Sequence, residues 1–423
     1  MSRALGSTLI LMAITFVSKL IGFVRELVLL ETLGIGVELD VFVVLYGLVT
    51  LVAGALGICI VTSLTPIAGQ YRSALATRQL LLEGLRLGCG VGFAALVLCT
   101  AYVAIAGQEG GASSWQVALI VPFIVPFSLL AEYQVALFLS RDQRTPVIAG
   151  NLIISLPLVA ALLVFDLDIV TYALGLMLSF VLRAVIFTVL LLRSSEADQS
   201  TPSQSSSLFG TRLGRTLAGG SAMLAIAAIS VTAAMIAREL GEGEATMIAY
   251  GLKVPQFVIT SLWFVLGTGF FAQLVTRGTA GSKRQIAVYS MINLAIMAAF
   301  VAAIALLPDQ STLPAALASS ELLMVLAASL PFLPLIVLTP IVEMSQRLLV
   351  TAQRHMAVLS VTAAILIAGL AAQILAVLTG SAALLAWSIV IGGVCGAGVA
   401  CVMVARLDLS TPSHEASFSN VSA

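Results

Sequence analysis

The chain has 423 residues, of which 60% are hydrophobic and only 9% are charged. Soluble globular proteins carry roughly 25% charged residues, so this composition excludes an ordinary soluble catalytic domain. The formal net charge is zero, which gives no indication of nucleic-acid binding. The few charges are concentrated between long apolar runs, a pattern that is typical of repeated membrane spans.

Apolar runs of about 20 residues or more follow one another along the whole chain. They cover residues 8–30, 41–69, 79–106, 117–140, 146–165, 169–192, 214–237, 246–275, 285–307, 322–342, 356–378 and 383–404. Each run can cross about 30 Å of hydrocarbon as a helix, and lipid offers no partner to an open backbone. We therefore predict an all-α polytopic membrane protein with about 12 transmembrane helices.

The first run resembles a signal peptide, because Arg3 precedes an apolar segment. However, Lys19 interrupts that segment and no small-residue cleavage site follows it, so we interpret it as a retained first span.

Basic residues alternate between the predicted loops, and this pattern sets the orientation. The alternate loops and the two tails contain Arg3, Arg72, Arg78, Arg86, Arg141, Arg144, Arg193, Arg212, Arg215, Arg277, Lys283, Arg284, Arg347, Arg354 and Arg406. The opposite loops contain only Arg238 but many acidic residues. Because basic loops face the cytoplasm, we predict that both termini are cytoplasmic and that the protein is a multi-pass protein of the cytoplasmic (inner) membrane.

A polar Ser-rich stretch, Ser194–Ser207, falls at the middle of the chain. It predicts an N-terminal six-helix lobe over residues 1–193, a cytoplasmic linker over 194–212 and a C-terminal six-helix lobe over 213–406. Residues 407–423 are predicted to form a disordered cytoplasmic tail.

Two similarities suggest that the lobes are related and enclose a central cavity, although chance resemblance between apolar helices is the alternative. Leu33–Gly36 (LGIG) and Leu240–Gly243 (LGEG) are 207 residues apart, and Glu132 and Glu343 are 211 residues apart. Duplicated halves around a cavity are a common plan of transporters.

The most unusual residues are charges inside the predicted spans. Lys19 and Arg183 lie near the middle of spans one and six, too deep to reach the headgroups easily. They should face a polar cavity or a buried partner, for which Glu26, two turns after Lys19, and Glu132 are candidates. Structural ion pairs between helices are the alternative to a substrate cavity.

Arg25 and Lys253 lie in the outer halves of spans one and eight, where they either line the same cavity or snorkel towards the headgroups. Basic residues in a membrane cavity favour an anionic substrate, since the guanidinium fork of Arg suits phosphate or pyrophosphate. The five cysteines and two histidines lack metal-ligand or catalytic spacing, so we predict no metal site and no catalytic residue.

The first span carries a recognisable motif. Ser18–Glu26 (SKLIGFVRE) resembles the S-R-x-x-G-F-x-R-[DE] signature of the MviN/MurJ family of lipid II flippases. Further stretches are similar to other motifs of this family: Leu33–Gly36 with Asp40–Phe42, Leu240–Gly243, Tyr250–Phe271 and Arg141–Pro146.

The resemblance implies a V-shaped protein that moves an undecaprenyl-pyrophosphate-linked glycan from the inner to the outer leaflet. By position, Lys19 replaces one cavity arginine, Arg25 matches a second, and Asp40 matches an acidic residue of the outer gate. The chain also departs from the family, which has fourteen spans. Leu48–Leu64 lacks the charge expected in the second span, and Lys253 lies about one turn from the expected arginine of span eight.

These observations lead to a flippase hypothesis for lipid II or a similar lipid-linked oligosaccharide. We predict that Lys19, Arg25, Lys253 and Arg183 bind the diphosphate, and that Glu26, Asp40 and Glu132 act as gate residues or charge partners. No cofactor is predicted. Energy would come from an ion gradient or the membrane potential, because the sequence has no nucleotide-binding motif. The expected partners are the lipid-linked glycan and membrane lipids, with a monomer favoured.

Four alternatives remain open at this point. The protein could instead flip exopolysaccharide or O-antigen repeat units, export drugs or small cations as an antiporter, act as a membrane enzyme, or serve as a scaffold in envelope synthesis. An antiporter of cations should have acidic residues in its cavity, and a membrane enzyme should have a sizeable outer loop. The central charges of the predicted spans are mostly basic, with Glu132 the main exception, and no predicted outer loop is longer than about a dozen residues.

Overall fold

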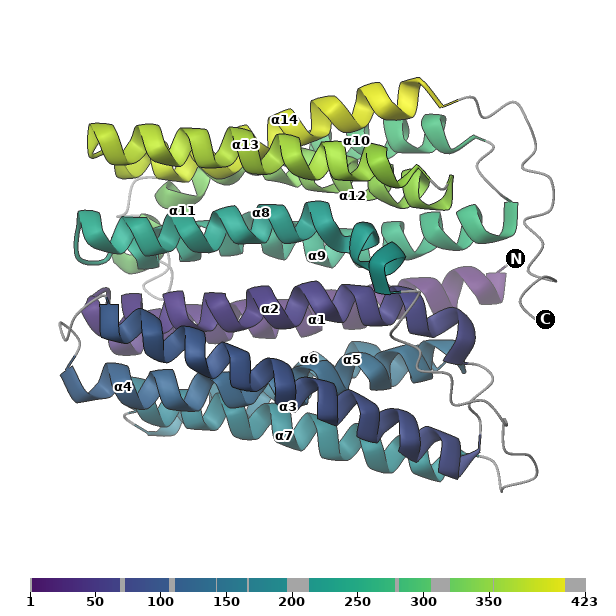
Figure 1. Ribbon diagram of the computed structural model, residues 1–423, viewed down its shortest axis with the longest axis horizontal. Coiled ribbons are helices and arrows are strands. Elements are labelled where there is room, and N and C mark those ends of the chain that lie inside the picture. Colours follow the sequence, from purple (N-terminus) through teal and green to yellow (C-terminus); the bar gives the residue numbers. More distant parts are fainter. Residues whose placement is uncertain are drawn as a thin grey trace.

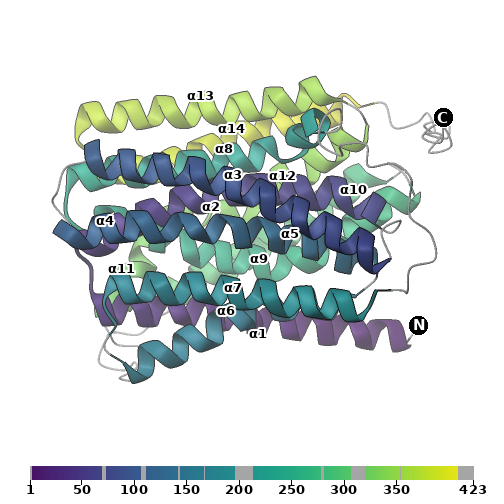
Figure 2. The ribbon, with the colours of Figure 1, turned by 60° about the horizontal axis from the view of Figure 1, so that its bottom comes forward.

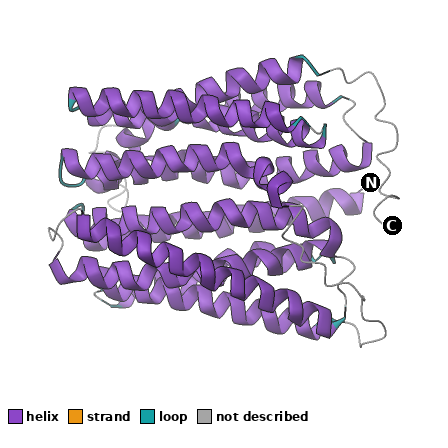
Figure 3. Cartoon of the chain, in the orientation of Figure 1, coloured by secondary structure: helices purple, strands orange, loops and turns teal. Residues whose placement is uncertain are grey.

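The structure is a computed structural model, and it describes residues 2–68, 73–105, 111–141, 143–165, 167–195, 213–277, 281–305, 320–352 and 354–407. Over these ranges the chain consists of helices joined by turns, without a β-strand (Figure 3). This confirms the predicted all-α class. Most of the predicted linker (196–212) and nearly all of the predicted tail (408–423) lie outside the described residues, so the domain boundaries stay predictions.

The first half of the chain contains seven α-helices and one short 3₁₀ segment. In order, these are α1 (Ser2–Leu33), α2 (Val37–Ala68), α3 (Ala74–Ile105), α4 (Gly111–Ile120), η1 (Val121–Phe123), α5 (Ile124–Ser140), α6 (Arg144–Val164) and α7 (Ile169–Arg193). The second half has the same order of elements: α8 (Leu213–Leu240), α9 (Glu244–Arg277), α10 (Ser282–Ala305), α11 (Ser320–Ser329), η4 (Leu330–Phe332), α12 (Leu335–Thr351), α13 (His355–Thr379) and α14 (Ala382–Ala405).

The two halves match most closely at a broken helix. In the first half, the 10-residue α4 is followed by a Pro-containing 3₁₀ segment and the 17-residue α5. In the second half, the 10-residue α11, the segment η4 and the 17-residue α12 repeat this arrangement. Pro122 and Pro331 lie inside these 3₁₀ segments, where proline removes a backbone donor and breaks the α-helical ladder. The repeat inferred from short sequence matches therefore extends to helix lengths and break points.

Each half packs around its own hydrophobic core. One large cluster of buried side chains comes mainly from α1–α7, and a second comes from α8–α14. Figure 1 shows the two sets of helices as separate layers, with α2 packed on α8 and α1 on α9 between them. After the rotation in Figure 2, all helices still run along the same long axis.

The beginning of α1 and the end of α14 lie at one end of the bundle, which we call the terminal end (Figure 1). The opposite, distal end carries the α1–α2 and α8–α9 connections. Within the described residues, nine helices are long and apolar enough to cross a membrane, or ten if the pair α11–η4 and α12, bent by 46°, forms one span. The helices α1 and α9, which carry Lys19, Arg25, Glu26 and Lys253, are outside this count. The number twelve therefore stays a prediction.

Close packing of α3 on α5 depends on glycines at four-residue intervals. A Cβ atom at Gly88 would lie 2.7 Å from Pro126 Cα, and one at Gly84 would lie 2.8 Å from Tyr133 Cδ2. Small residues at this spacing let two membrane helices approach closely. The first lobe therefore uses α3 and α5 as a closely packed pair of helices.

Replacing Gly88 with alanine should lower thermal stability, because the new methyl group would collide with rigid backbone at Pro126. Overpacking of this kind typically destabilises by about 1–3 kcal/mol. Gly90→Ala is the matched control, since a Cβ there has no neighbour within 4 Å and alanine favours the helix. The measurement is the Tm of each purified variant in one detergent. Equal Tm values for both variants would contradict the close α3–α5 contact.

Candidate functional site

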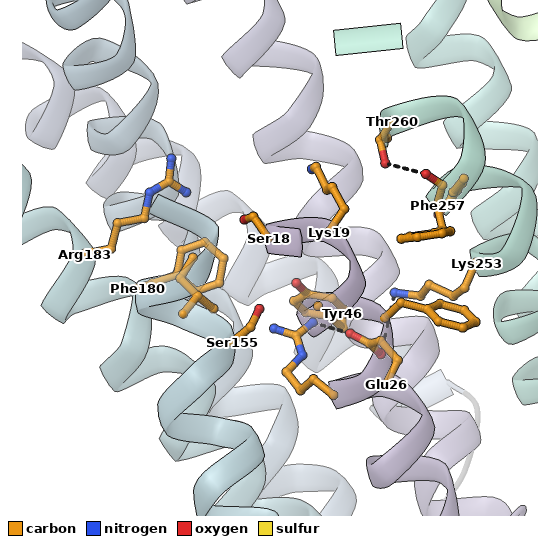
Figure 4. A pocket seen from close by; sticks show the side chains of 15 residues that line it. Ser18, Lys19, Glu26, Tyr46, Ser155, Phe180, Arg183, Lys253, Phe257 and Thr260 are labelled. Carbon is orange, nitrogen blue, oxygen red and sulfur yellow. Dashed lines mark hydrogen bonds and ion pairs between the residues drawn. The ribbon is translucent and has the colours of Figure 1, made fainter. Parts of the chain in front are cut away.

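A cavity of about 300 Å³ lies between the two halves, and all four basic residues predicted for the site line it. Its lining comes from α1, α2, α6, α7 and α9 and consists of Ser18, Lys19, Gly22, Phe23, Arg25, Glu26, Tyr46, Ile154, Ser155, Phe180, Arg183, Lys253, Gln256, Phe257 and Thr260. Figure 4 shows Arg183, Lys19 and Lys253 approaching the same space from α7, α1 and α9. The sequence therefore identified residues that meet in one place despite their separation along the chain.

Arg25, Glu26 and Lys253 form one charged group that joins the two halves. The Arg25 guanidinium pairs with Glu26, and Lys253 Nζ lies 3.7 Å from Glu26 Oε2 (Figure 4). Arg25 and Glu26 are only 9% and 8% exposed, and the fully buried Tyr172 and Tyr250 lie near the pair. Arg25 therefore does not snorkel outwards, because its side chain is enclosed and ion-paired.

The prediction that Glu26 could be the partner of Lys19 is wrong. Glu26 uses its two carboxylate oxygens on Arg25 and Lys253 instead. Within the described part of the chain, Lys19 has no carboxylate within 4 Å. The two-turn spacing placed Lys19 and Glu26 on one face of α1, but it could not show that Lys253 comes from another helix to the same carboxylate.

Arg183 resembles Lys19 in having no ion-pair partner among the residues described. Its guanidinium carbon lies 5.3 Å from the centre of the Phe187 ring, a cation–π arrangement. A Cβ atom at Gly150 of α6 would lie 3.0 Å from Arg183 Nε, so the glycine provides room for this side chain. Arg183 is therefore accommodated by α6 and α7 without being neutralised by an acid.

Glu132 lies near Lys19 and Arg183 and interacts electrostatically with both. No ion pair within 4 Å joins it to either residue, and it is not part of the cavity lining. Its side chain packs over Gly57 of α2, where a Cβ atom would lie 2.8 Å from Glu132 Cγ. Glu132 is thus a nearby acid that the two basic residues do not contact directly.

The charges occupy two levels along the bundle. Lys19 is 14 residues from the distal end of α1, and Arg183 is 14 residues from the distal end of α7. Arg25 and Lys253 are only 8 and 9 residues from the distal ends of their helices. Because a helix rises 1.5 Å per residue, Lys19 lies about 9 Å from Arg25 along α1, towards the terminal end.

Asp40 lies outside the cavity, at the distal end, where it links the two halves. Its carboxylate accepts hydrogen bonds from the backbone N–H of Gly243 (2.7 Å), the backbone N–H of Thr246 (2.7 Å) and the Thr246 hydroxyl (2.5 Å). It thereby caps the first turn of α9 from the neighbouring helix α2, a position where a negative charge is favourable. Gly243 has φ +83°, a conformation that favours glycine. We call this group the Asp40 clamp.

Several contacts between the halves carried no signal in the sequence. Arg238 Nη1 donates to the Tyr102 hydroxyl at 3.1 Å, which joins α8 to α3 near the distal end. The Phe257 ring of α9 lies 5.6 Å from Phe16 and 5.4 Å from Phe23 of α1. Aromatic residues are ordinary in apolar spans, so only the fold could show that these three rings meet.

Basic side chains outnumber acidic ones in the lining of the cavity. Four basic side chains and one carboxylate face it, and Arg and Lys are suited to bind phosphate oxygens. Among the residues that the structure describes, no group of three or more His, Cys, Asp or Glu side chains could hold a metal ion.

No protein-family model matches the chain, and no curated protein matches it. Solved structures do match. An outward-facing multidrug resistance MATE family transporter of the MOP superfamily has a TM-score of 0.62 and 15% identity, with 94% of each chain covered. A MOP superfamily transporter from Pyrococcus furiosus, described as having a binding pocket of reverse polarity, has a TM-score of 0.63 and 15% identity, again with 94% of each chain covered.

The lipid II flippase MurJ in an inward closed conformation has a TM-score of 0.61 and 11% identity, covering 95% of this chain and 88% of that one. At these identities the comparisons establish the architecture. The chain is a multi-pass membrane protein with the fold of the MOP superfamily transporters.

Proposed function

We propose that the protein is a flippase that moves a polyprenyl-pyrophosphate-linked glycan, lipid II or a similar lipid-linked oligosaccharide, from the inner to the outer leaflet of the bacterial cytoplasmic membrane. One observation carries this proposal: Lys19, Arg25, Arg183 and Lys253 line one cavity that contains a single carboxylate, Glu26. Placing such an excess of positive charge inside a membrane protein is unfavourable unless an anion compensates it. A diphosphate headgroup supplies that compensation.

In this proposal the distal end faces outwards and both termini lie in the cytoplasm. Among the described residues, Arg78, Arg141, Arg193, Lys283 and Arg354 lie at or near helix ends on the terminal end, which supports this orientation under the positive-inside rule. Movement of the two lobes around the cavity would expose the headgroup to each side in turn, as in other transporters built from repeated halves. An ion gradient or the membrane potential would drive the cycle.

A multidrug or cation antiporter is the second candidate, and the fold supports it. Several of the matching structures are multidrug MATE transporters, whereas MurJ is a flippase of the same fold. The composition of the cavity supports the flippase over the antiporter, because a binder of organic cations needs an excess of acidic groups. Four basic residues against one acid in the lining favour an anionic cargo. The Pyrococcus furiosus protein, with its reverse pocket polarity, provides a precedent for a pocket of different polarity within this fold.

The test is a leaflet-accessibility assay for lipid II in cells that are depleted of their own flippase and supplied with this protein. Restored outer-leaflet lipid II is the expected result. If lipid II stays inside while the protein is well expressed, lipid II is not the cargo, and other lipid-linked repeat units are tested in the same assay. Loss of resistance to toxic organic cations upon deletion, with no change in any lipid-linked glycan, would overturn the flippase assignment.

A further inference from the structure

We propose that the four basic residues form two successive phosphate subsites: an entry subsite made by Lys19 and Arg183, and a second subsite made by Arg25 and Lys253, which Glu26 occupies until it is displaced. This inference rests on the proposed function and assigns an order to the contacts of the anionic headgroup.

The two pairs of basic residues differ in how far a carboxylate compensates their charge. Glu26 pairs with both Arg25 and Lys253, so this group of three carries a net charge of only plus one. Lys19 and Arg183 line the cavity and have no carboxylate within 4 Å among the described residues. Glu132 interacts with both at longer range, but it forms no ion pair with either and lies outside the cavity lining. An incoming phosphate therefore gains most from Lys19 and Arg183, because it would have to replace an existing ion pair at Arg25 and Lys253.

The two pairs of basic residues also lie at different levels along the bundle. Lys19 lies about 9 Å nearer the terminal end than Arg25, as the six-residue separation along α1 requires. At the distal end, the Asp40 clamp and the contact of Arg238 with Tyr102 hold the halves together. A headgroup that approaches from the terminal end thus meets the Lys19–Arg183 pair before it meets Glu26.

The side chains of Lys19 and Arg183 have the chemistry to bind a phosphate group. Arg183 offers a forked donor that can hold two phosphate oxygens, and its Nε is buried without a hydrogen-bond partner in the described structure. Lys19 comes from α1 and acts as a point charge (Figure 4). This pair suits a phosphate or diphosphate group, whether it is free or attached to a prenyl chain.

The second subsite also connects the two halves of the protein. Arg25 and Glu26 belong to α1 and Lys253 belongs to α9, so the group bridges the two halves. The entry subsite lies entirely on α1 and α7 of the first half. A phosphate that moves from the first pair to the second therefore breaks the contact between Glu26 and Lys253 across the interface. The position of the cargo would thereby control how the two lobes are held together.

The experiment measures binding of inorganic pyrophosphate and of farnesyl diphosphate to the purified full chain in detergent, by isothermal titration calorimetry. Lys19→Gln and Arg183→Gln should each weaken binding about tenfold or more, since each removes a charge-assisted contact. Lys253→Gln removes the same charge at the second subsite and should change Kd less than about threefold. Glu26→Gln should bind as tightly as the wild-type protein or more tightly, while leaflet transport falls.

Folding is controlled by size-exclusion profile and Tm, and Arg183→Lys provides a conservative variant that keeps the charge but loses the fork. Its affinity should fall between those of the wild-type protein and Arg183→Gln. Binding of both probes supports the subsite for a free anion, and binding of farnesyl diphosphate alone supports it for a lipid headgroup. Loss of binding in Lys253→Gln with full binding in Lys19→Gln and Arg183→Gln would overturn the order. A negative lipid II assay with the predicted binding pattern would instead remove only the proposed cargo.

Discussion

Replacing Lys19 and Arg25 together with glutamine is expected to abolish transport while the protein still folds and inserts. The double variant removes one basic residue from each level of the cavity, so a diphosphate would have only Arg183 and Lys253 left to balance its charge. Transfer of an anion into a membrane cavity depends on such compensation, and each lost contact is worth about 1.5–3 kcal/mol. Glu26 keeps Lys253 as a partner, which protects the buried carboxylate in the variant.

The measurement is leaflet transport of the lipid-linked glycan, together with expression level, membrane insertion and Tm. Arg78→Gln with Arg86→Gln is the matched control, because it removes the same two charges from exposed positions on α3. The control should transport at close to the wild-type rate. Full transport by a well-expressed Lys19 and Arg25 double variant would contradict the assignment of the cavity.

Asp40→Ala should open the distal end of the protein and slow transport. The substitution removes the carboxylate that accepts three hydrogen bonds from Gly243 and Thr246 at the start of α9. Hydrogen bonds to a charged group contribute about 1.5–3 kcal/mol each, so even partial loss would shift the balance of the two access states more than tenfold. The expected readout is a longer distance between spin labels at positions 31 and 239, which are exposed near the distal ends of α1 and α8.

Asp168→Ala provides the control for the loss of an N-cap carboxylate. Asp168 accepts a hydrogen bond from the backbone N–H of Thr171 at 2.7 Å and caps α7 within the first half alone. Hydrogen bonding from Thr171 lowers the pKa of Asp168, so its carboxylate is ionised at neutral pH and the control also removes a negative charge. The spin-label distance should stay unchanged in this variant. An equal change in both variants would mean that capping in general, and not the link between halves, sets the distance.

Much of the site could be predicted from the sequence because a charge inside an apolar run is rare and needs a physical reason. This principle identified Lys19, Arg25, Arg183 and Lys253, and all four line the cavity. It failed on pairing, since Glu26 contacts Lys253, which is 227 residues away in the sequence, and not Lys19, which shares its helix. Periodicity reports which residues share a face of one helix, but it contains no information on the partner helix.

The fold was predictable for a similar reason. Long apolar runs can only be helices in lipid, so the all-α class followed from composition and run length. The breaks at η1 and η4 could not be located from the sequence, because prolines also occur inside continuous helices, such as Pro157 in α6 and Pro340 in α12. The aromatic contacts of Phe257 and the bond from Arg238 to Tyr102 depend on how the halves pack, which no local pattern encodes.

Glu132 and Glu343 occupy equivalent positions in the two halves, so their surroundings can be compared directly. Glu132 and Glu343 are both the ninth residue of a 17-residue helix, α5 and α12. In the second half, Arg347 lies one turn later and pairs with Glu343, so that acid is neutralised within its own helix. In the first half the corresponding residue is Ala136, and Glu132 interacts electrostatically with Lys19 and Arg183 instead. The same position therefore holds an acid of a local ion pair in the second half and a long-range counter-charge for Lys19 and Arg183 in the first half. The two halves share their helix lengths here but differ in how they use this acid.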